Sequence, residues 1–88
     1  MKICKEFVLR EIAGEAVLVP VGDAAKEFNG LINLNDVAAF IWKNLEKVSG
    51  LDEMTELVLK EFDVDEELAK KDVEGFCGEL VQTGFIQY

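Results

Sequence analysis

The spacing of apolar residues changes once along this chain, near Asn35, and that change constrains the fold more than any other sequence feature. Before Asn35 the apolar residues form short runs rich in β-branched side chains, whereas after it they recur at i, i+3, i+4 and i+7. The first pattern is typical of strands and the second of amphipathic helices. The sequence therefore predicts strands in the first part of the chain and helices in the second.

Three strands are expected in the first part. Residues 7–12 and 16–21 are two apolar runs separated by Ala13-Gly14-Glu15, which predicts a β-hairpin. Residues 22–27 are small and polar and are expected to form a loop. Residues 28–34 form the third predicted strand, which contains an Asn-Gly pair that tolerates a positive φ.

Three helices are expected in the second part. Asn35 is a favourable N-cap for the first helix, which ends at Ser49-Gly50. The second helix begins near Asp52, and the third has Asp65 as its N-cap. Gly84 suits the left-handed position that often ends a helix, and the apolar residues after it are expected to return to the core.

Length and composition indicate one globular domain over residues 1–88, because half of the residues are hydrophobic and 31% are charged. The element order β-β-β-α-α-α predicts an α+β fold in which a three-stranded antiparallel sheet is followed by three helices. Winged-helix domains have a similar arrangement. No apolar run is long enough for a membrane helix or a secretory signal, so we expect a cytoplasmic protein with no membrane contact.

The charge of the chain limits its partners. Nine Lys and Arg side chains face eighteen Asp and Glu side chains, which gives a net charge of −9. Residues 1–44 hold five basic and six acidic side chains, whereas residues 45–88 hold four basic and twelve acidic ones. Nucleic-acid binding is driven by basic side chains that neutralise phosphates, so we expect no nucleic-acid partner.

The sequence offers no catalytic or metal-binding constellation. It has no histidine, which excludes Ser-His-Asp and Cys-His pairs. Cys4 and Cys77 form no CxxC motif and are expected to be ordinary free thiols. The acidic segment 63–67 lacks the glycine of a calcium loop and is expected to begin a helix. We therefore expect no catalytic residue, no metal, no cofactor and no enzymatic activity.

Aromatic residues at helical spacing usually lie in the core, and Phe40, Phe62 and Phe76 fit that pattern. Trp42 lies between apolar positions of the first helix and is expected to be partly exposed. We favour a role for Trp42 as a lid over the core, with a contact surface as the alternative.

Five segments in a fixed order carry a likeness to a known family. They are Phe7-Val8-Leu9-Arg10, Val17-Leu18-Val19-Pro20, Asn29-Gly30-Leu31-Ile32-Asn33-Leu34-Asn35, Ala39-Phe40-Ile41-Trp42 and Asp72-Val73-Glu74-Gly75-Phe76. With them the chain resembles the pyrroloquinoline quinone biosynthesis protein D (PqqD-like) family. The resemblance implies a recognition element of ribosomally synthesised, post-translationally modified peptide pathways. Such an element binds the leader segment of a precursor peptide and presents it to a maturase, commonly a radical S-adenosylmethionine enzyme.

The resemblance also implies where the leader peptide binds. In the family the leader adds as a strand to the third β-strand and lies in a groove against the third helix. Backbone pairing would set its register, while alternate side chains enter the groove. The strand candidates here are Gly30, Leu31, Ile32, Asn33 and Leu34. The helix candidates are Asp72, Val73, Phe76, Cys77 and Leu80, although the same apolar stripe must also fill the core.

Two other functions remain as alternatives to this peptide-binding adaptor. A winged-helix transcription regulator would have the predicted architecture, but its recognition helix should carry basic residues. The third predicted helix has Lys70 and Lys71 against six acidic residues, which disfavours that function. A small cofactor-dependent enzyme would need a base and a nucleophile that the sequence does not offer.

Overall fold

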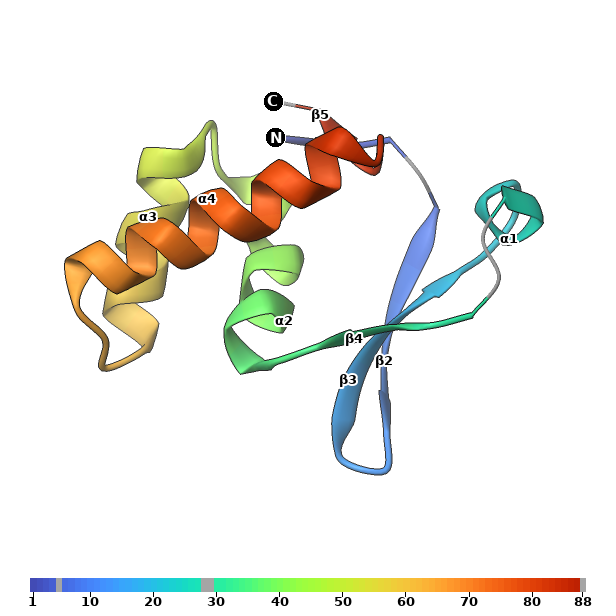
Figure 1. Ribbon diagram of the computed structural model, residues 1–88, viewed down its shortest axis with the longest axis horizontal. Helices are drawn as coiled ribbons and strands as arrows, with labels where there is room; N and C mark the ends of the chain where they lie inside the picture. Colours follow the sequence, from blue (N-terminus) through green and yellow to red (C-terminus); the bar gives the residue numbers. More distant parts are fainter. Residues whose placement is uncertain (5, 28–29, 88) are drawn as a thin grey trace.

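The computed structural model describes residues 1–4, 6–27 and 30–87. The elements in chain order are β1 (Lys2–Ile3), β2 (Phe7–Ile12), β3 (Glu15–Pro20), α1 (Ala24–Glu27), β4 (Ile32–Leu34), α2 (Asp36–Asn44), the 3-10 helix η1 (Leu45–Lys47), α3 (Leu51–Glu61), α4 (Glu66–Gln82) and β5 (Ile86–Gln87). Figure 1 shows β2, β3 and β4 on one side of α2, α3 and α4, with α1 apart from those three helices and the two ends of the described chain close together.

The strands β2, β3 and β4 form an antiparallel sheet in that order, so β3 is central. The β2–β3 hairpin turns through Ala13 at φ 54° and Gly14 at φ 80°. Two positive φ values in a two-residue loop match the twist of the flanking strands, which explains the tight turn at this point. The structure confirms the predicted α+β fold with a three-stranded antiparallel sheet followed by helices.

Local capping defines the start of α2 and the end of α4. The Asn35 side chain accepts a hydrogen bond from the Ala38 N–H at 2.8 Å, which confirms the predicted N-cap. Gly84 has a φ of 82°, and the Phe85 N–H donates to the Leu80 carbonyl at 2.8 Å. This bond reverses the chain after α4, and Phe85 is buried as expected.

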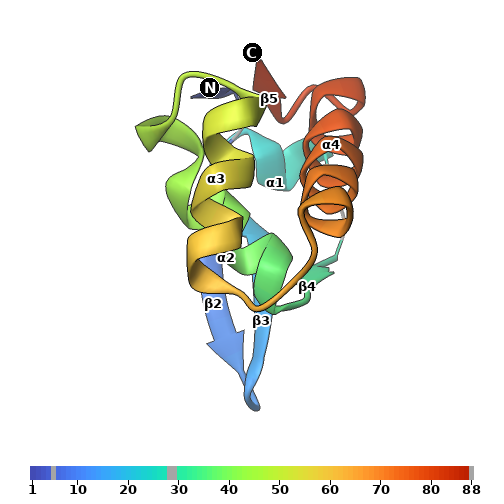
Figure 2. The same cartoon turned by 90° about the vertical axis from the view of Figure 1, so that its left-hand side faces the viewer.

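The helices α3 and α4 lie side by side, and α2 packs between them and the sheet (Figure 2). Side chains from the sheet and from α2, α3 and α4 pack between these elements and form the core. The largest fully buried ones are Leu18, Ile41, Leu45, Met54, Val58, Val73 and Cys77. The β2–β3 hairpin extends beyond the helices, which leaves its turn exposed to solvent (Figure 2).

Three local differences from the sequence prediction concern short elements. The strands β1 and β5 pair antiparallel, with Ile3 opposite Ile86, and neither strand was predicted. Residues 24–27 form the short helix α1 in place of a loop. The third strand of the sheet spans only Ile32–Leu34, and of the longer strand expected, residues 28–29 lie outside the described part of the chain.

Among the aromatic residues, Trp42 differs from the prediction. Trp42 is only 7% exposed, because Phe7 covers it with a T-shaped contact at a centroid distance of 6.2 Å. Phe40 and Phe62 are half-buried and contact each other at a centroid distance of 5.4 Å in a T-shaped pair, and both pack against the core as predicted. Asp65 precedes α4 as predicted, but its side chain makes no capping hydrogen bond.

Candidate functional site

The three-stranded sheet has two outer strands within the described part of the chain, β2 and β4. The outer edge of an edge strand presents N–H and C=O groups that can pair with an added strand. A hollow of about 430 Å³ lies on the β2 side and includes the half-buried Phe40 and Phe62. On the β4 side the chain continues from β4 to Asn35, and Asn35 lines a smaller pocket beneath α4.

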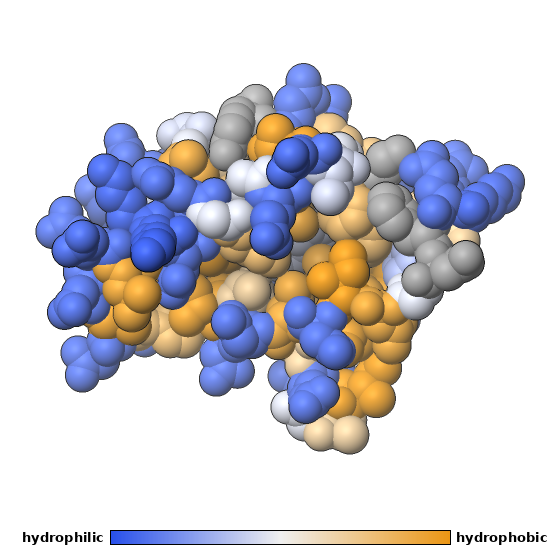
Figure 3. Space-filling model, in the orientation of Figure 1, coloured by the Kyte–Doolittle hydropathy of each residue, from blue (hydrophilic) through white to orange (hydrophobic). Residues whose placement is uncertain are grey.

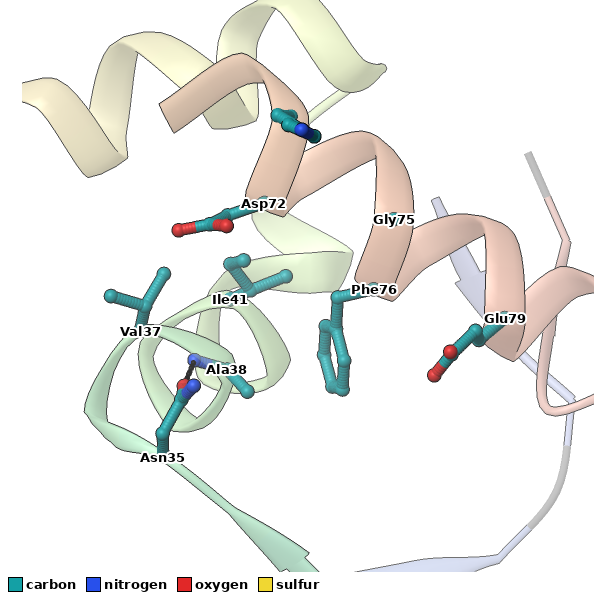
Figure 4. A pocket seen from close by; sticks show the side chains of 9 residues that line it. Asn35, Val37, Ala38, Ile41, Asp72, Gly75, Phe76 and Glu79 are labelled. Atoms are coloured by element: carbon teal, nitrogen blue, oxygen red, sulfur yellow. Dashed lines mark hydrogen bonds between the residues drawn. The ribbon is translucent and has the colours of Figure 1, made fainter. Parts of the chain in front are cut away.

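The pocket beneath α4 has a volume of about 250 Å³ and lies between α4 and the first turns of α2. Val37, Ala38 and Ile41 line it from α2. From α4, Phe76 points toward α2, and Asp72 and Glu79 lie on either side of it (Figure 4). We call this site the α2–α4 pocket. Its volume is below the range of about 300–1,000 Å³ typical of small-molecule sites, and it suits a single inserted side chain.

The strand residues predicted for peptide binding run toward the α2–α4 pocket in the order of the sequence. Leu31 is 53% exposed, Ile32 is half-buried and Asn33 is exposed. Leu34 is buried against the core, and Gly30 precedes the strand with a φ of 105°. The side chains of β4 therefore alternate between the core and solvent, while its outer backbone edge has no neighbouring strand among the described residues.

The helix residues predicted for peptide binding divide between the two faces of α4. Asp72 and Phe76 line the α2–α4 pocket. Val73 and Cys77 have no exposed surface and Leu80 is 5% exposed, so their side chains fill the core behind the pocket. Of the five predicted helix residues, only Asp72 and Phe76 are accessible to a peptide in this structure. A direct peptide contact by Val73, Cys77 or Leu80 stays a prediction.

Burial raises the pKa of the Cys77 thiol to about 11. The cause is desolvation, because the thiolate would lose its hydration among apolar neighbours. Cys77 is therefore a neutral, inert thiol behind the pocket, whereas Cys4 is exposed. Both cysteines are free, which confirms the sequence prediction.

Several residues of the α2–α4 pocket were not predicted from the sequence as peptide-binding residues. They are Asn35, Val37, Ala38, Ile41, Lys71, Gly75 and Glu79. Glu79 could have been found, because it lies one turn after Phe76 and two turns after Asp72 on the same face of α4. The α2 residues carry no such signal, since only the packing of two helices brings them to this pocket.

The described part of the chain contains no cluster of three or more His, Cys, Asp or Glu side chains arranged for a metal ion. Among the same residues, no helix has the length and apolar character needed to cross a membrane.

Residues 15–86 match the family described as Coenzyme PQQ synthesis protein D (PqqD). The chain belongs to the PqqD family. This finding confirms the resemblance drawn from the five sequence segments. Among proteins with curated descriptions, none matches the sequence.

A solved structure described as "TbiB1 in Complex with the TbiA(beta) Leader Peptide" has the same fold as this PqqD-family protein. The TM-score is 0.71 and the sequence identity is 24%, over 99% of this chain and 95% of that chain. The likeness therefore extends over nearly the whole length of both chains.

Proposed function

We propose that this chain is a non-catalytic adaptor that binds the leader segment of a ribosomally synthesised precursor peptide. The observation that carries the proposal is the α2–α4 pocket, which begins at Asn35, the residue that directly follows the edge strand β4. An edge strand can bind an extended peptide through its backbone, and a neighbouring pocket can select one of the peptide side chains. Membership of the PqqD family and the fold shared with a leader-peptide complex support this function.

The peptide adds as a strand to the outer edge of β4 and lies beneath α4. Pairing with the backbone from Gly30 to Leu34 fixes its register. Every second peptide side chain then faces α4, where Phe76 and Asp72 are accessible. Val73, Cys77 and Leu80 support this face of α4 from the core side.

The chemical modification belongs to a partner enzyme. The chain has no histidine, and its buried thiol is neutral at physiological pH. A maturase, such as a radical S-adenosylmethionine enzyme, would modify the precursor peptide that the adaptor presents in the cytoplasm. Holding one peptide segment raises the effective concentration of the remainder at the maturase without any chemistry by the adaptor.

Proline scanning of β4 tests the strand addition. Neighbouring N–H groups of a strand point alternately toward the adjacent strand and toward the outer edge. Proline has no N–H group. Of the two variants Ile32→Pro and Asn33→Pro, one therefore removes an N–H that points to the outer edge of β4, and the other removes an N–H that donates to β3. We expect the first to stay folded and to bind at least about tenfold more weakly, and the second to lose stability. Fluorescence polarisation with labelled peptides encoded by short reading frames beside the gene measures the affinity, and circular dichroism measures folding.

Prolines in the other edge strand provide the control. Val8→Pro and Leu9→Pro make the same change in β2, and whichever of them stays folded should bind the peptides as wild type does. Wild-type affinity in a folded β4 proline variant whose altered N–H faces outward would contradict strand addition to β4. Weakened binding only in the β2 variants would indicate that the peptide binds instead at the hollow beside Phe40 and Phe62.

A further inference from the structure

The α2–α4 pocket has an apolar centre and an acidic side chain at each end. Phe76, Val37, Ala38 and Ile41 provide the apolar surface. The carboxylates of Asp72 and Glu79 lie on opposite sides of Phe76 (Figure 4). Both residues are exposed, and neither forms an ion pair with another residue in the described ranges.

The spacing of these carboxylates matches an extended peptide. Asp72 and Glu79 are two turns of α4 apart, which corresponds to about 10 Å along the helix axis. In an extended strand, side chains on one face are about 6.6 Å apart, and those on both sides of a central side chain are about 13 Å apart. Long Lys or Arg side chains at the two outer positions can bend inward to reach both carboxylates.

The two ends of the pocket are not equally negative. Lys71 lines the pocket beside Asp72 and partly offsets its charge. Glu79 lies near the C-terminus of α4, where the carbonyl groups add negative potential, and the last turn of α4 has no basic residue. A cation is therefore stabilised more strongly at the Glu79 end than at the Asp72 end.

We infer that the peptide bound here carries an apolar residue with a Lys or Arg two positions away on each side. The apolar side chain enters the α2–α4 pocket beside Phe76, and the basic side chains meet Asp72 and Glu79. The pattern is symmetric, so it holds for either direction of the added strand. The inference rests on the proposed function, because it requires an extended peptide along β4.

The wider surface favours the same partner chemistry. Hydrophilic side chains gather over α3 and the adjoining part of α4, whereas apolar side chains are concentrated over the sheet (Figure 3). Residues 45–88 carry twelve acidic and four basic side chains, so a basic peptide segment is attracted from solution and an acidic one is repelled.

A selection from random peptides tests this sequence pattern. Yeast-displayed random dodecapeptides are sorted for binding to the fluorescently labelled protein, and the enriched sequences are aligned. We expect Lys or Arg to be enriched two positions before and after a central apolar residue. In a synthetic enriched peptide, each flanking basic residue is replaced by Ala in turn. One replacement should raise the dissociation constant about three- to tenfold, which assigns that residue to the Glu79 end, and the other should raise it less.

Charge reversal on the protein links the pattern to the pocket. The Asp72→Lys/Glu79→Lys variant should bind a version of the enriched peptide in which both flanking basic residues are replaced by Glu more tightly than it binds the original enriched peptide. The control Glu67→Lys/Glu74→Lys makes the same change of charge at two exposed positions of α4 outside the pocket, also two turns apart, and should leave the preference for basic flanks intact. Raising the salt from about 0.05 to 0.5 M should reduce the difference between basic and acidic peptides.

The outcomes separate the inference from the proposed function. Enriched peptides without basic flanks, or a charge-reversed variant with wild-type preference, would overturn the inference while binding at β4 remained. If no peptide is enriched, or if enriched peptides bind the β4 proline variants and Phe76→Asp as they bind wild type, both the inference and the proposed site are overturned.

Discussion

The turn of the β2–β3 hairpin contains a residue that is not suited to its backbone conformation. Ala13 has a φ of 54°, where a Cβ atom crowds the backbone. Gly14 follows it at φ 80° and carries no Cβ atom. The two-residue turn therefore stores a small strain at its first position only, and an Asn-Gly pair would relieve it.

Ala13→Asn should stabilise the protein, because Asn adopts a positive φ more readily than Ala. We expect the free energy of unfolding to rise by about 0.5–1 kcal/mol, measured by urea denaturation. Ala25→Asn is the control, since Ala25 is also exposed but has no positive φ, and it should give no gain. A lower stability for Ala13→Asn would contradict a positive φ at this position of the turn.

The two thiols should react very differently with a maleimide at pH 8. Cys4 is exposed and should be modified quickly, whereas Cys77 is buried with its pKa raised to about 11 and should react only after unfolding. Mass spectrometry should therefore find one added group on the native protein and two in denaturant. Bound peptide should not change this result, because Cys77 lies behind the α2–α4 pocket. Rapid double modification of the native protein would contradict its burial.

Cys77 also makes stability depend on pH. Its pKa rises from 9.0 to about 11 on folding, so the folded state keeps the proton to a higher pH than the unfolded state does. This contribution is complete below pH 9 and is lost as the pH rises toward 11. Cys77→Ala should show a smaller loss of melting temperature over that interval than wild type. Equal losses would mean that the thiol titrates alike in both states.

At the scale of single elements, α4 has two internal glycines that no packing contact explains. A Cβ atom at Gly75 or Gly78 would meet no atom within 4 Å outside the local helix backbone. Each glycine weakens a helix by about 0.5–1 kcal/mol relative to alanine. Gly75 lines the α2–α4 pocket, whereas Gly78, which lies one turn further along α4, does not line it. A bound peptide backbone close to α4 would explain the presence of a glycine at position 75, because a side chain there would occupy the space of the peptide.

The two substitutions form a matched pair. Gly75→Ala and Gly78→Ala should each raise the free energy of unfolding by about 0.5–1 kcal/mol. Only Gly75→Ala should weaken peptide binding, because its methyl group enters the space proposed for the peptide. Urea denaturation and fluorescence polarisation measure the two effects. Equal peptide affinity for the two variants would argue against a peptide that approaches α4 at this point.

At the scale of the whole molecule, charge separates the proposed function from a DNA-binding one. The net charge is −9, and α4 carries Lys70 and Lys71 among many more acidic residues. A helix of this composition repels phosphates in either groove of a duplex. The shape of the domain alone would not exclude such a role, since one fold can serve unrelated functions.

We therefore expect no binding to duplex DNA. A fluorescein-labelled random-sequence duplex should keep its polarisation unchanged as protein is added at low salt, where non-specific binding is strongest. The enriched peptide serves as the positive control under the same conditions. A rise in polarisation that falls steeply with added salt would instead indicate phosphate contacts and would contradict the adaptor function.

Local sequence signals predicted the features that depend on neighbouring residues. The hairpin follows from Ala13-Gly14-Glu15 between two β-branched runs, the start of α2 from Asn35, and the end of α4 from Gly84. In each case the residues that make the structure lie within a few positions of one another, so the pattern and the hydrogen bonds coincide. The periodicity of α4 likewise showed that one face is apolar.

Only the tertiary structure decided which side chains of α4 lie in the core and which line the α2–α4 pocket. Periodicity grouped Phe76 with Val73 and Cys77, but the position of α2 leaves Phe76 half-buried while the other two are enclosed. The pairing of β1 with β5 and the cover of Trp42 by Phe7 depend in the same way on contacts between distant segments. Such contacts leave little trace in local spacing, because each segment satisfies its own pattern whichever partner it meets.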